Sequence, residues 1–237
     1  GTAASNTDGT ITSSVSANTT AGMSVVSYTG TGSAATIGHG LSSAPEMVIV
    51  KNRDQTDAWQ VYCASNTAAP ETDYLVLNDT AATADNVDRW NDTLPSASVF
   101  TIGDGVEVNT NTEDYIAYCF HSVEGYSKVG SYSSNNSTDG PFLYLGFTPA
   151  YILLKCTNAT DNWNIYDIKR DGYNGTGGTY QLRADSNAAG FTSAATMVDL
   201  VSNGMKIRTD DAGTNGSSRD YIYYAVAESP FKYSNAR

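Results

Sequence analysis

The sequence predicts an all-β protein that consists of two tandem β-sandwich-like units. Short runs rich in β-branched and aromatic residues recur along the 237 residues, and clusters of Gly, Asn, Asp, Ser or Thr separate them. This cadence is typical of antiparallel strands joined by short turns. An apolar period of about 3.6 residues, which an amphipathic helix requires, is hard to find. The 16 Tyr, 6 Phe and 3 Trp argue against a disordered chain.

The predicted strands are distributed over both halves of the chain. Two short segments, residues 81–90 and 186–200, are the best candidates for helices, but Thr residues interrupt both. We expect strands at residues 23–28, 46–52, 59–63, 74–78, 98–103 and 114–120, and then at 141–147, 150–156, 163–168, 179–184, 204–209 and 220–227.

Residues that recur at a fixed distance indicate an internal duplication. A shift of 104 positions places the segment TDAWQVY (56–62) on TDNWNIY (160–166). Further along, a shift of 106 positions places Tyr115 on Tyr221, which implies a small loop insertion between matching strands. Such self-similarity is the signature of a repeated structural unit.

The duplication divides the chain into a first β-sandwich unit at residues 23–127 and a second unit at 128–237. Residues 1–22 lie outside the repeat and are rich in Thr and Ser, so we expect a linker or an extended arm there. The chain begins with Gly1 and lacks the basic start and apolar core of a signal peptide. We therefore expect a fragment or processed product of a longer protein.

Two tryptophans and two aspartates mark the same place in both copies of the repeat: Trp59, Trp163, Asp57 and Asp161. Alternation along a strand places Trp59 on the face that also carries Val61 and Cys63. This favours tryptophans that cap the sandwich core and aspartates that close the preceding turn. In the alternative reading, the tryptophans are exposed platforms for sugar rings and the aspartates bind sugar hydroxyls.

The charge balance argues against nucleic acid as a partner. The formal net charge is −12, and no cluster of Lys and Arg offsets the repulsion of phosphate backbones. No apolar run approaches the roughly 18 residues that a membrane-spanning helix needs, so we expect no membrane insertion. A surface rich in Ser, Thr, Asn and Gly, with only 16% charged residues in the chain, suits an extracellular or virion-surface protein.

The cysteines and histidines form no recognisable catalytic or metal motif. Cys63, Cys119 and Cys156 lack CxxC spacing, so neither a disulfide framework nor a zinc site is expected, although a Cys63–Cys119 bridge stays open. A catalytic thiol would need His39 or His121, and neither lies in a triad motif. GxSxG, HExxH, P-loop and Rossmann patterns are absent. The sequence therefore favours a protein that is not an enzyme.

Acid-rich loops provide the candidate metal ligands Asp104, Asp210 and Asp211. Carboxylates on loops suit Ca²⁺, but the spacing does not match an EF-hand, and such loops are ordinary hairpin connections. We therefore expect no cofactor, with Ca²⁺ as the ion that these loops would fit.

A tyrosine-rich strand provides the candidate binding residues. In the run YIYY, Tyr221 and Tyr223 share one face and Tyr224 lies on the other. Aromatic side chains on both faces of a strand indicate either an assembly interface or a binding strip.

Six stretches of the chain resemble a known family. They are NTDGTITSSVSANTTAG (6–22), VSYTGTGSAATIGHGL (26–41), PEMVIVKNRD (45–54), WNDTLPSASVF (90–100), YIAYCFHSVEGYSKVGSY (115–132) and STDGPF (137–142). The family comprises duplicated β-domains of structural and tail-fibre-like proteins from marine tailed phages, especially those infecting cyanobacteria. It has no established catalytic residues.

The resemblance implies a virion-associated, modular and non-enzymatic protein. We expect a tail-fibre or similar adhesin module on the virion surface that binds a host cell-surface glycan or protein. The expected partners also include other virion proteins and further copies of this chain, with a trimer as the usual state of phage fibres. The alternatives are an architectural capsid-decoration or fibre-shaft module and a glycan-degrading enzyme of the tailspike type.

Overall fold

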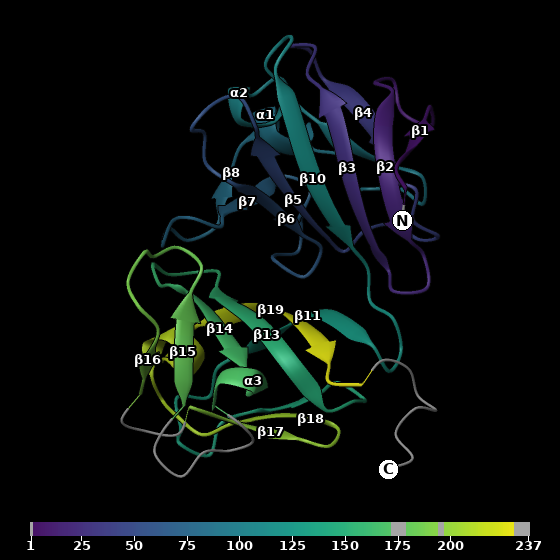
Figure 1. The fold of residues 1–237 in the computed structure, drawn as a ribbon. Helices are drawn as coiled ribbons and strands as arrows, with labels where there is room; N and C mark the ends of the chain where they lie inside the picture. The colour runs from purple at the N-terminus through teal and green to yellow at the C-terminus, as the bar shows by residue number, and fades with distance from the viewer. Residues whose placement is uncertain (1, 172–178, 194–196, 230–237) are drawn as a thin grey trace. The chain divides into compact units, whose positions relative to one another are not determined.

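The computed structural model describes residues 2–171, 179–193 and 197–229, and it confirms the predicted all-β class (Figure 1). The chain forms two compact units. The first comprises Gly1–Leu77 and Thr83–Ser122, and the second comprises Asn78–Ala82 and Val123–Arg237. No helix among the described residues is long and apolar enough to cross a membrane.

The first unit contains an eight-stranded antiparallel sheet in the order β1-β2-β3-β10-β5-β6-β7-β8 and a separate pair, β4 and β9. Two short helices follow β8 and β9. The elements are β1 (Ala4–Asn6), β2 (Ser13–Asn18), β3 (Met23–Thr29), β4 (Ala35–Gly38), β5 (Met47–Asn52), β6 (Gln60–Cys63), β7 (Asp73–Val76), β8 (Ala84–Asp85), α1 (Val87–Trp90), β9 (Val99–Ile102), α2 (Val106–Asn109) and β10 (Asp114–Phe120).

The core of the first unit lies between the large sheet and the β4–β9 pair. Along β10, alternate residues are buried, which is the pattern of a strand with one face on a core. Val26, Val50 and Tyr115 of the large sheet join one apolar cluster with Ile37 of β4 and Phe100 of β9. The apolar alternation therefore sets both the register of the strands and the face that is buried.

The second unit has the same kind of architecture. A six-stranded sheet runs in the order β11-β19-β13-β14-β15-β16, and a three-stranded sheet in the order β12-β18-β17. The elements are β11 (Ser127–Ser133), β12 (Phe142–Tyr144), β13 (Pro149–Cys156), β14 (Trp163–Asp167), α3 (Ile168–Asp171), β15 (Tyr180–Arg183), β16 (Phe191–Thr192), β17 (Val198–Val201), β18 (Gly204–Ile207), α4 (Ala212–Asn215) and β19 (Asp220–Ala227).

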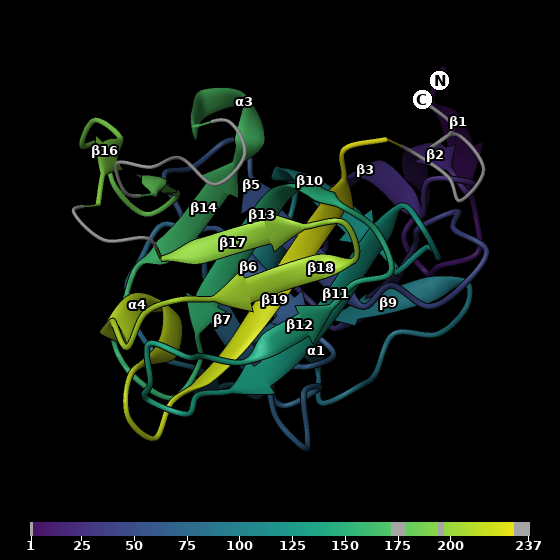
Figure 2. The same cartoon turned by 90° about the horizontal axis from the view of Figure 1, so that it is seen from below.

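The three-stranded sheet of the second unit lies across the larger sheet, and Figure 2 shows β17 and β18 crossing in front of β19. Ile152 and Leu154 of β13 and Tyr166 of β14 form one apolar cluster with Met205 and Ile207 of β18. Both units are therefore sandwich-like, as the sequence predicts.

The same tyrosine contacts recur in the two units. The rings of Tyr28 and Tyr115 stack with centroids 5.3 Å apart in the first unit, and those of Tyr132 and Tyr221 stack 5.0 Å apart in the second. The hydroxyl of Tyr28 donates to a carbonyl in α2, and that of Tyr132 donates to a carbonyl in α4. These matching contacts support the internal duplication, which stays a prediction.

The segment predicted as a linker or arm, residues 1–22, is part of the first unit. Strand β2 pairs with β3 in register, and β1 pairs with β2. Ile11 and Val15 of this segment are buried in the first core. Alternation of Val15 with small polar residues lets one face of β2 join the core while the other stays polar. The unit boundary lies between Ser122 and Val123, a few residues before the predicted one.

The helical candidates are mostly not helical. Of residues 81–90, only Val87–Trp90 forms a helix, α1, which Asn86 caps by accepting from the Asp88 backbone N–H. Within 186–200, Phe191–Thr192 and Val198–Val201 are strands, and residues 194–196 lie outside the described residues.

Candidate functional site: a hydroxyl-lined groove in the first unit

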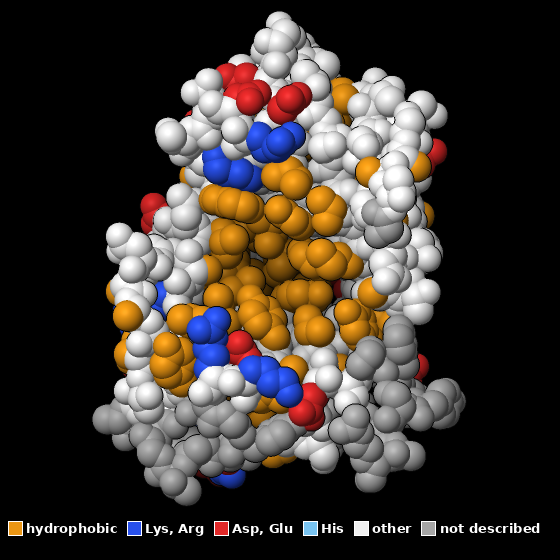
Figure 3. All heavy atoms as spheres, viewed as in Figure 1, with side chains coloured by type: hydrophobic (Ala, Val, Ile, Leu, Met, Phe, Trp, Pro, Cys, Tyr) orange, Lys and Arg blue, Asp and Glu red, His pale blue; other side chains and the backbone are white. Residues whose placement is uncertain are grey.

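A polar groove of about 360 Å³ opens on the surface of the first unit at one end of strands β1, β2, β3 and β10. On the face shown in Figure 3, the area over β1 and β2 is mostly polar, whereas hydrophobic side chains gather elsewhere. The groove is lined by Ser5, Thr12, Ser13, Ser14, Ser27, Tyr28, Thr29, Arg53, Asp114 and Tyr115.

Three serines form a row across this groove because of the strand register. Ser5 of β1 lies opposite Ser14 of β2, and Ser14 lies opposite Ser27 of β3. Directly paired residues point to the same face of a sheet, with neighbouring strands about 4.8 Å apart. Within the described chain, none of the three hydroxyls makes a hydrogen bond, so all three are available to a ligand.

A charged rim borders the serine row. Thr29 Oγ1 donates to Asp114 Oδ1 (2.8 Å), and the Asp114 backbone N–H donates to Asp54 Oδ2 (2.6 Å). The Arg53 backbone N–H donates to the Asp114 carbonyl (2.8 Å), which fixes the position of this residue beside the groove. The exposed Arg53 guanidinium forms no ion pair with any described residue. The rim therefore offers the Asp114 carboxylate, held in place by hydrogen bonds, and the Arg53 guanidinium, which pairs with no described carboxylate.

The strands that carry the groove are anchored from the opposite face of the sheet, because Tyr28 alternates with Ser27 and Thr29 along β3 and belongs to the core. Tyr28 and Tyr115 are buried, and their rings stack on each other. The Tyr28 hydroxyl donates to the Val108 carbonyl (2.8 Å), and the Tyr115 hydroxyl donates to the Val106 carbonyl (2.6 Å). Burial raises the pKa of both phenols, so they stay neutral and serve as structure. The groove suits a ligand with many hydroxyls and a negative group.

The second unit has only part of this arrangement. Ser133 Oγ donates to Asp220 Oδ1 (2.6 Å), as Thr29 does to Asp114 in the first unit. The Thr157 backbone N–H donates to the Asp220 carbonyl (2.8 Å), as the Arg53 backbone N–H does to the Asp114 carbonyl. However, the buried Thr157 stands where Arg53 stands, and the described residues include no counterparts of β1 and β2 beside β11. The groove is thus a property of the first unit among the described residues.

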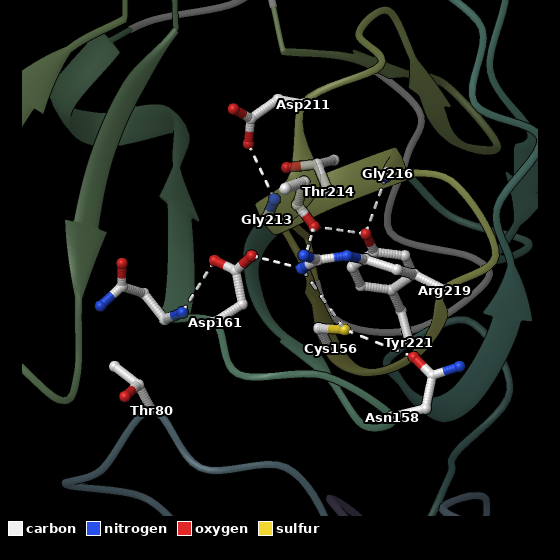
Figure 4. A network of polar contacts seen from close by, with 12 residues as sticks. Thr80, Cys156, Asn158, Asp161, Asp211, Gly213, Thr214, Gly216, Arg219 and Tyr221 are labelled. Carbon is white, nitrogen blue, oxygen red and sulfur yellow. Dashed lines mark hydrogen bonds and ion pairs between the residues drawn. The ribbon is translucent and has the colours of Figure 1, made fainter.

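The predicted anchor aspartates take part in polar networks within each unit. In the second unit, Arg219 Nη1 donates to Asp161 Oδ2 (2.6 Å) and to the Ala212 carbonyl (3.0 Å), and it lies 3.9 Å from Cys156 Sγ (Figure 4). Lys155 Nζ donates to the Asp161 carbonyl (2.8 Å). These contacts join β13 and β19 to the turn before β14, so Asp161 has a structural role.

The first unit closes the corresponding turn with different side chains. Asn52 Nδ2 donates to Asp57 Oδ2 (2.8 Å) and to Glu113 Oε2 (2.6 Å). Glu113 and Arg219 each precede the last strand of their unit by one residue. A carboxylate in the first unit, Glu113, therefore takes the structural place that the Arg219 guanidinium has in the second unit.

The two repeat tryptophans lie on the sheet face opposite the apolar clusters, rather than over the cores as expected. Trp59 shares this face with Val61 and Cys63, as the alternation indicates, but the neighbouring Tyr62 belongs to the first core cluster. Trp59 is half-buried and stacks on Tyr118 with centroids 6.3 Å apart. Trp163 is buried in β14. Alternation shows which residues share a face, but it does not show which face meets the core.

The tyrosine strip is not an exposed binding surface. Tyr221 and Tyr223 are buried in the core of the second unit, and Tyr224 is half-buried on the other face of β19. The Tyr221 hydroxyl donates to the Ala212 carbonyl (2.5 Å) and accepts from the Gly216 backbone N–H (2.9 Å). The expectation that these tyrosines bind a ligand is therefore wrong for Tyr221 and Tyr223.

The candidate calcium ligands do not converge. Asp104 and Asp210 are exposed, and Asp211 caps α4 by accepting from the Gly213 backbone N–H (2.9 Å). Among the described residues, no three His, Cys, Asp or Glu side chains are grouped as a metal site would require.

The cysteines and histidines are buried or committed. Cys63 and Cys119 are free thiols on opposite faces of the first sheet, since Cys119 belongs to the apolar cluster and Cys63 does not, so they cannot form the bridge. Burial raises the pKa of each thiol to about 12, which keeps both neutral. The His39 ring is buried, with Nε2 near the Ser96 carbonyl, and His121 Nδ1 lies near the Ser122 carbonyl.

Comparison with known proteins places the chain in one family. A family model described as a domain of unknown function (DUF7483) matches residues 1–230, so the chain belongs to that family. No curated protein and no solved structure matches the chain.

Proposed function

We propose that this member of the DUF7483 family is a non-enzymatic adhesin module of a phage virion surface, and that the groove of its first unit binds a host cell-surface glycan. The observation that carries the proposal is the row of unpaired hydroxyls at Ser5, Ser14 and Ser27 beside the unpaired guanidinium of Arg53. The virion location rests on the resemblance of the sequence to tail-fibre-like proteins.

The chemistry of the groove favours a saccharide that carries a carboxylate or sulfate group. Serine hydroxyls both donate and accept hydrogen bonds, as sugar hydroxyls do. Arg53 would bind the anionic group through a planar fork of donors, and the neighbouring Asp114 would accept from ligand hydroxyls. The stacked tyrosines on the core face hold the strands of the groove in place, which reduces the ordering cost of binding.

The same groove gives little support to the alternative of a glycan-degrading enzyme. Asp114 is the one carboxylate among the lining residues, and the nearby Asp54 carboxylate is engaged by the Asp114 backbone N–H, whereas hydrolysis of a glycosidic bond normally uses two. Cleavage of a polysaccharide by the purified chain would nevertheless favour that alternative over the adhesin.

The test is a calorimetric titration of the full chain with acidic hexasaccharides, namely oligomers of alginate, polygalacturonate and chondroitin sulfate. Replacing Arg53 by Ala removes a charge-assisted contact of about 1.5–3 kcal/mol, so binding should weaken by at least tenfold. Ser14→Phe should obstruct the groove and abolish binding. The exposed Lys169 provides a control, since Lys169→Ala removes the same charge from the second unit, which does not contain the groove.

Two results would count against the adhesin. If none of the acidic saccharides binds and the chain does not adhere to host cells, the architectural alternative gains support. If Arg53→Ala and Lys169→Ala weaken binding equally, the attraction is a general effect of charge. Light scattering tests the accompanying proposal of a homo-oligomer, for which a trimer is expected.

A further inference from the structure

Two large aromatic side chains stand exposed on the three-stranded sheet of the second unit. Phe142 and Tyr144 of β12 are 47% and 62% exposed, although Leu143 between them is buried in the core. Since alternate residues of a strand share a face, both rings lie on the solvent side of this sheet, about 7 Å apart along the strand. Exposed large aromatics at adjacent positions of one face mark a site of interaction.

The register of the sheet completes this face. Phe142 lies opposite Lys206, which lies opposite Asp199, and Tyr144 lies opposite Gly204. Gly204 lets the strands and the Phe142 ring approach closely, because an added Cβ would lie 2.0 Å from the Leu143 carbonyl oxygen and 3.1 Å from the Phe142 ring. The backbone therefore admits only glycine there, and the Phe142 ring lies against it at the surface of the sheet.

Charged groups border the two rings. Lys206 Nζ pairs with Asp139 Oδ1 (2.6 Å), and Arg208 Nε pairs with Asp199 Oδ2 (2.5 Å). On the other side, Lys128 Nζ donates to the Tyr144 carbonyl (2.8 Å) and lies 5.9 Å from the centroid of its ring. The apolar area is thus a small platform with hydrogen-bond donors and acceptors at its margin.

We propose that this face, formed by Phe142, Tyr144, Gly204 and Lys206, is a second saccharide-binding site, at which neutral sugar rings stack on the two aromatic side chains. The faces of a pyranose ring carry C–H groups that pack on an aromatic ring, and its edge carries hydroxyls. Asp139 and Lys206 are placed to exchange hydrogen bonds with those hydroxyls. The site is separate from the groove and does not depend on the proposed function of that groove.

The size of the platform favours a saccharide over a protein. An aromatic side chain buries about 150–250 Å² at most, so the pair supplies well under the roughly 800 Å² that each partner of a stable protein interface buries. The ion pairs that flank the rings would also have to be desolvated beneath a protein partner.

The first unit lacks such a platform. Its strand β4 has the sequence Ala-Thr-Ile-Gly, with no aromatic residue. The Thr36 side chain is engaged by the Thr10 backbone N–H (2.9 Å), and the Ile11 backbone N–H donates to the Thr36 carbonyl (3.1 Å). Residues of the N-terminal segment thus occupy this part of the first unit, whereas Phe142 and Tyr144 are open to solvent.

The test uses the full chain and three neutral hexasaccharides: cellohexaose, maltohexaose and chitohexaose. Tyrosine fluorescence and calorimetry should detect binding of at least one of them. Phe142→Ala and Tyr144→Ala should each weaken that binding by about tenfold, the loss typical of one aromatic stacking partner. Phe142→Leu should lose nearly as much as Phe142→Ala, because it keeps apolar area but removes the ring.

Two controls separate this site from the groove and from a general loss of structure. Leu94→Ala removes another exposed apolar side chain, in the first unit, and should leave binding unchanged. Arg53→Ala should also leave it unchanged. Failure of all three sugars to bind would overturn the proposal, as would equal binding by the Phe142→Ala/Tyr144→Ala double variant. Self-association of the chain that the double variant abolishes would assign the face to a second copy instead.

Discussion

One buried tyrosine in the core of each unit, Tyr115 in the first and Tyr221 in the second, provides a direct test of the fold. We predict that Tyr115→Phe and Tyr221→Phe destabilise the first and second units by a similar amount. In the first unit, the Tyr115 hydroxyl donates to the Val106 carbonyl (2.6 Å) and accepts from the Thr110 backbone N–H (2.8 Å). In the second, the Tyr221 hydroxyl donates to the Ala212 carbonyl (2.5 Å) and accepts from the Gly216 N–H (2.9 Å).

The size of the destabilisation depends on which backbone groups lose their hydrogen-bond partner when the tyrosine hydroxyl is removed. The Val106 carbonyl would still accept from Thr110 Oγ1 (3.1 Å), and the Ala212 carbonyl would still accept from Arg219 (3.0 Å). Each substitution therefore leaves one backbone N–H without its partner, at a cost of about 1–3 kcal/mol. Taking about 2 kcal/mol for each, the melting temperature of a unit of this size should fall by about 8 °C.

Differential scanning calorimetry measures both effects, provided that the two units melt in separable transitions. Each substitution should lower one transition and leave the other in place. Tyr144→Phe is the matched control, because it removes the same hydroxyl from an exposed ring and should change neither transition. The reasoning would be refuted if both variants lost less than about 0.5 kcal/mol of unfolding free energy. It would also be refuted if the Tyr144→Phe control lost as much as they do.

Three further predictions concern charge. Arg219→Ala should destabilise the second unit by about 2 kcal/mol, measured by chemical denaturation, because its 2.6 Å ion pair with Asp161 is mostly shielded from solvent. A double-mutant cycle with Asp161→Ala should show that the two losses of stability are coupled, and additive losses would contradict this. Burial raises the pKa of Tyr166 to about 12, so the stability that this residue contributes, which is complete below pH 10, should fall by about 1.4 kcal/mol per pH unit between pH 10 and 12, and Tyr166→Phe should reduce the slope. Burial lowers the pKa of His39, so the first unit should lose stability as pH falls below about 6.5. The His39→Gln variant should not show this loss, because the side chain of Gln does not titrate.

The strands were the part of the fold that the sequence could predict. The β-branched and aromatic runs mark strands such as β5, β10 and β19 because their alternation matches one buried face. The short helices could not be predicted from the sequence, because a helical turn as short as α1 depends on its Asn86 cap more than on any apolar period.

Two errors had the same physical origin. Strand alternation shows that Tyr221 and Tyr223 share a face, but only the packing of the second sheet shows that this face is the core. Likewise, Ser and Thr residues around Ile11 and Val15 make the N-terminal segment look like a linker, whereas its two apolar side chains complete the first core.

The groove could not be predicted because its residues share no sequence motif. Ser5, Ser14 and Ser27 are ordinary serines in the sequence, and only the pairing of three strands brings them into one row. Arg53 lies in the turn directly after β5, and its backbone N–H places it beside the serines by donating to the Asp114 carbonyl. The one available signal was the excess of Ser and Thr in a segment that lies outside the predicted repeat.

The central claim is that this row of serines and Arg53 forms a ligand site, and an NMR titration tests it most directly. Backbone amide shifts of the ¹⁵N-labelled chain should be followed as the best acidic hexasaccharide is added. The account predicts saturable shifts concentrated at residues 5, 12–14, 27–29, 53 and 114, and Arg53→Ala should raise the saccharide concentration needed for them at least tenfold. Saturable shifts that cluster on any other surface, or none at all with every acidic saccharide, would contradict it.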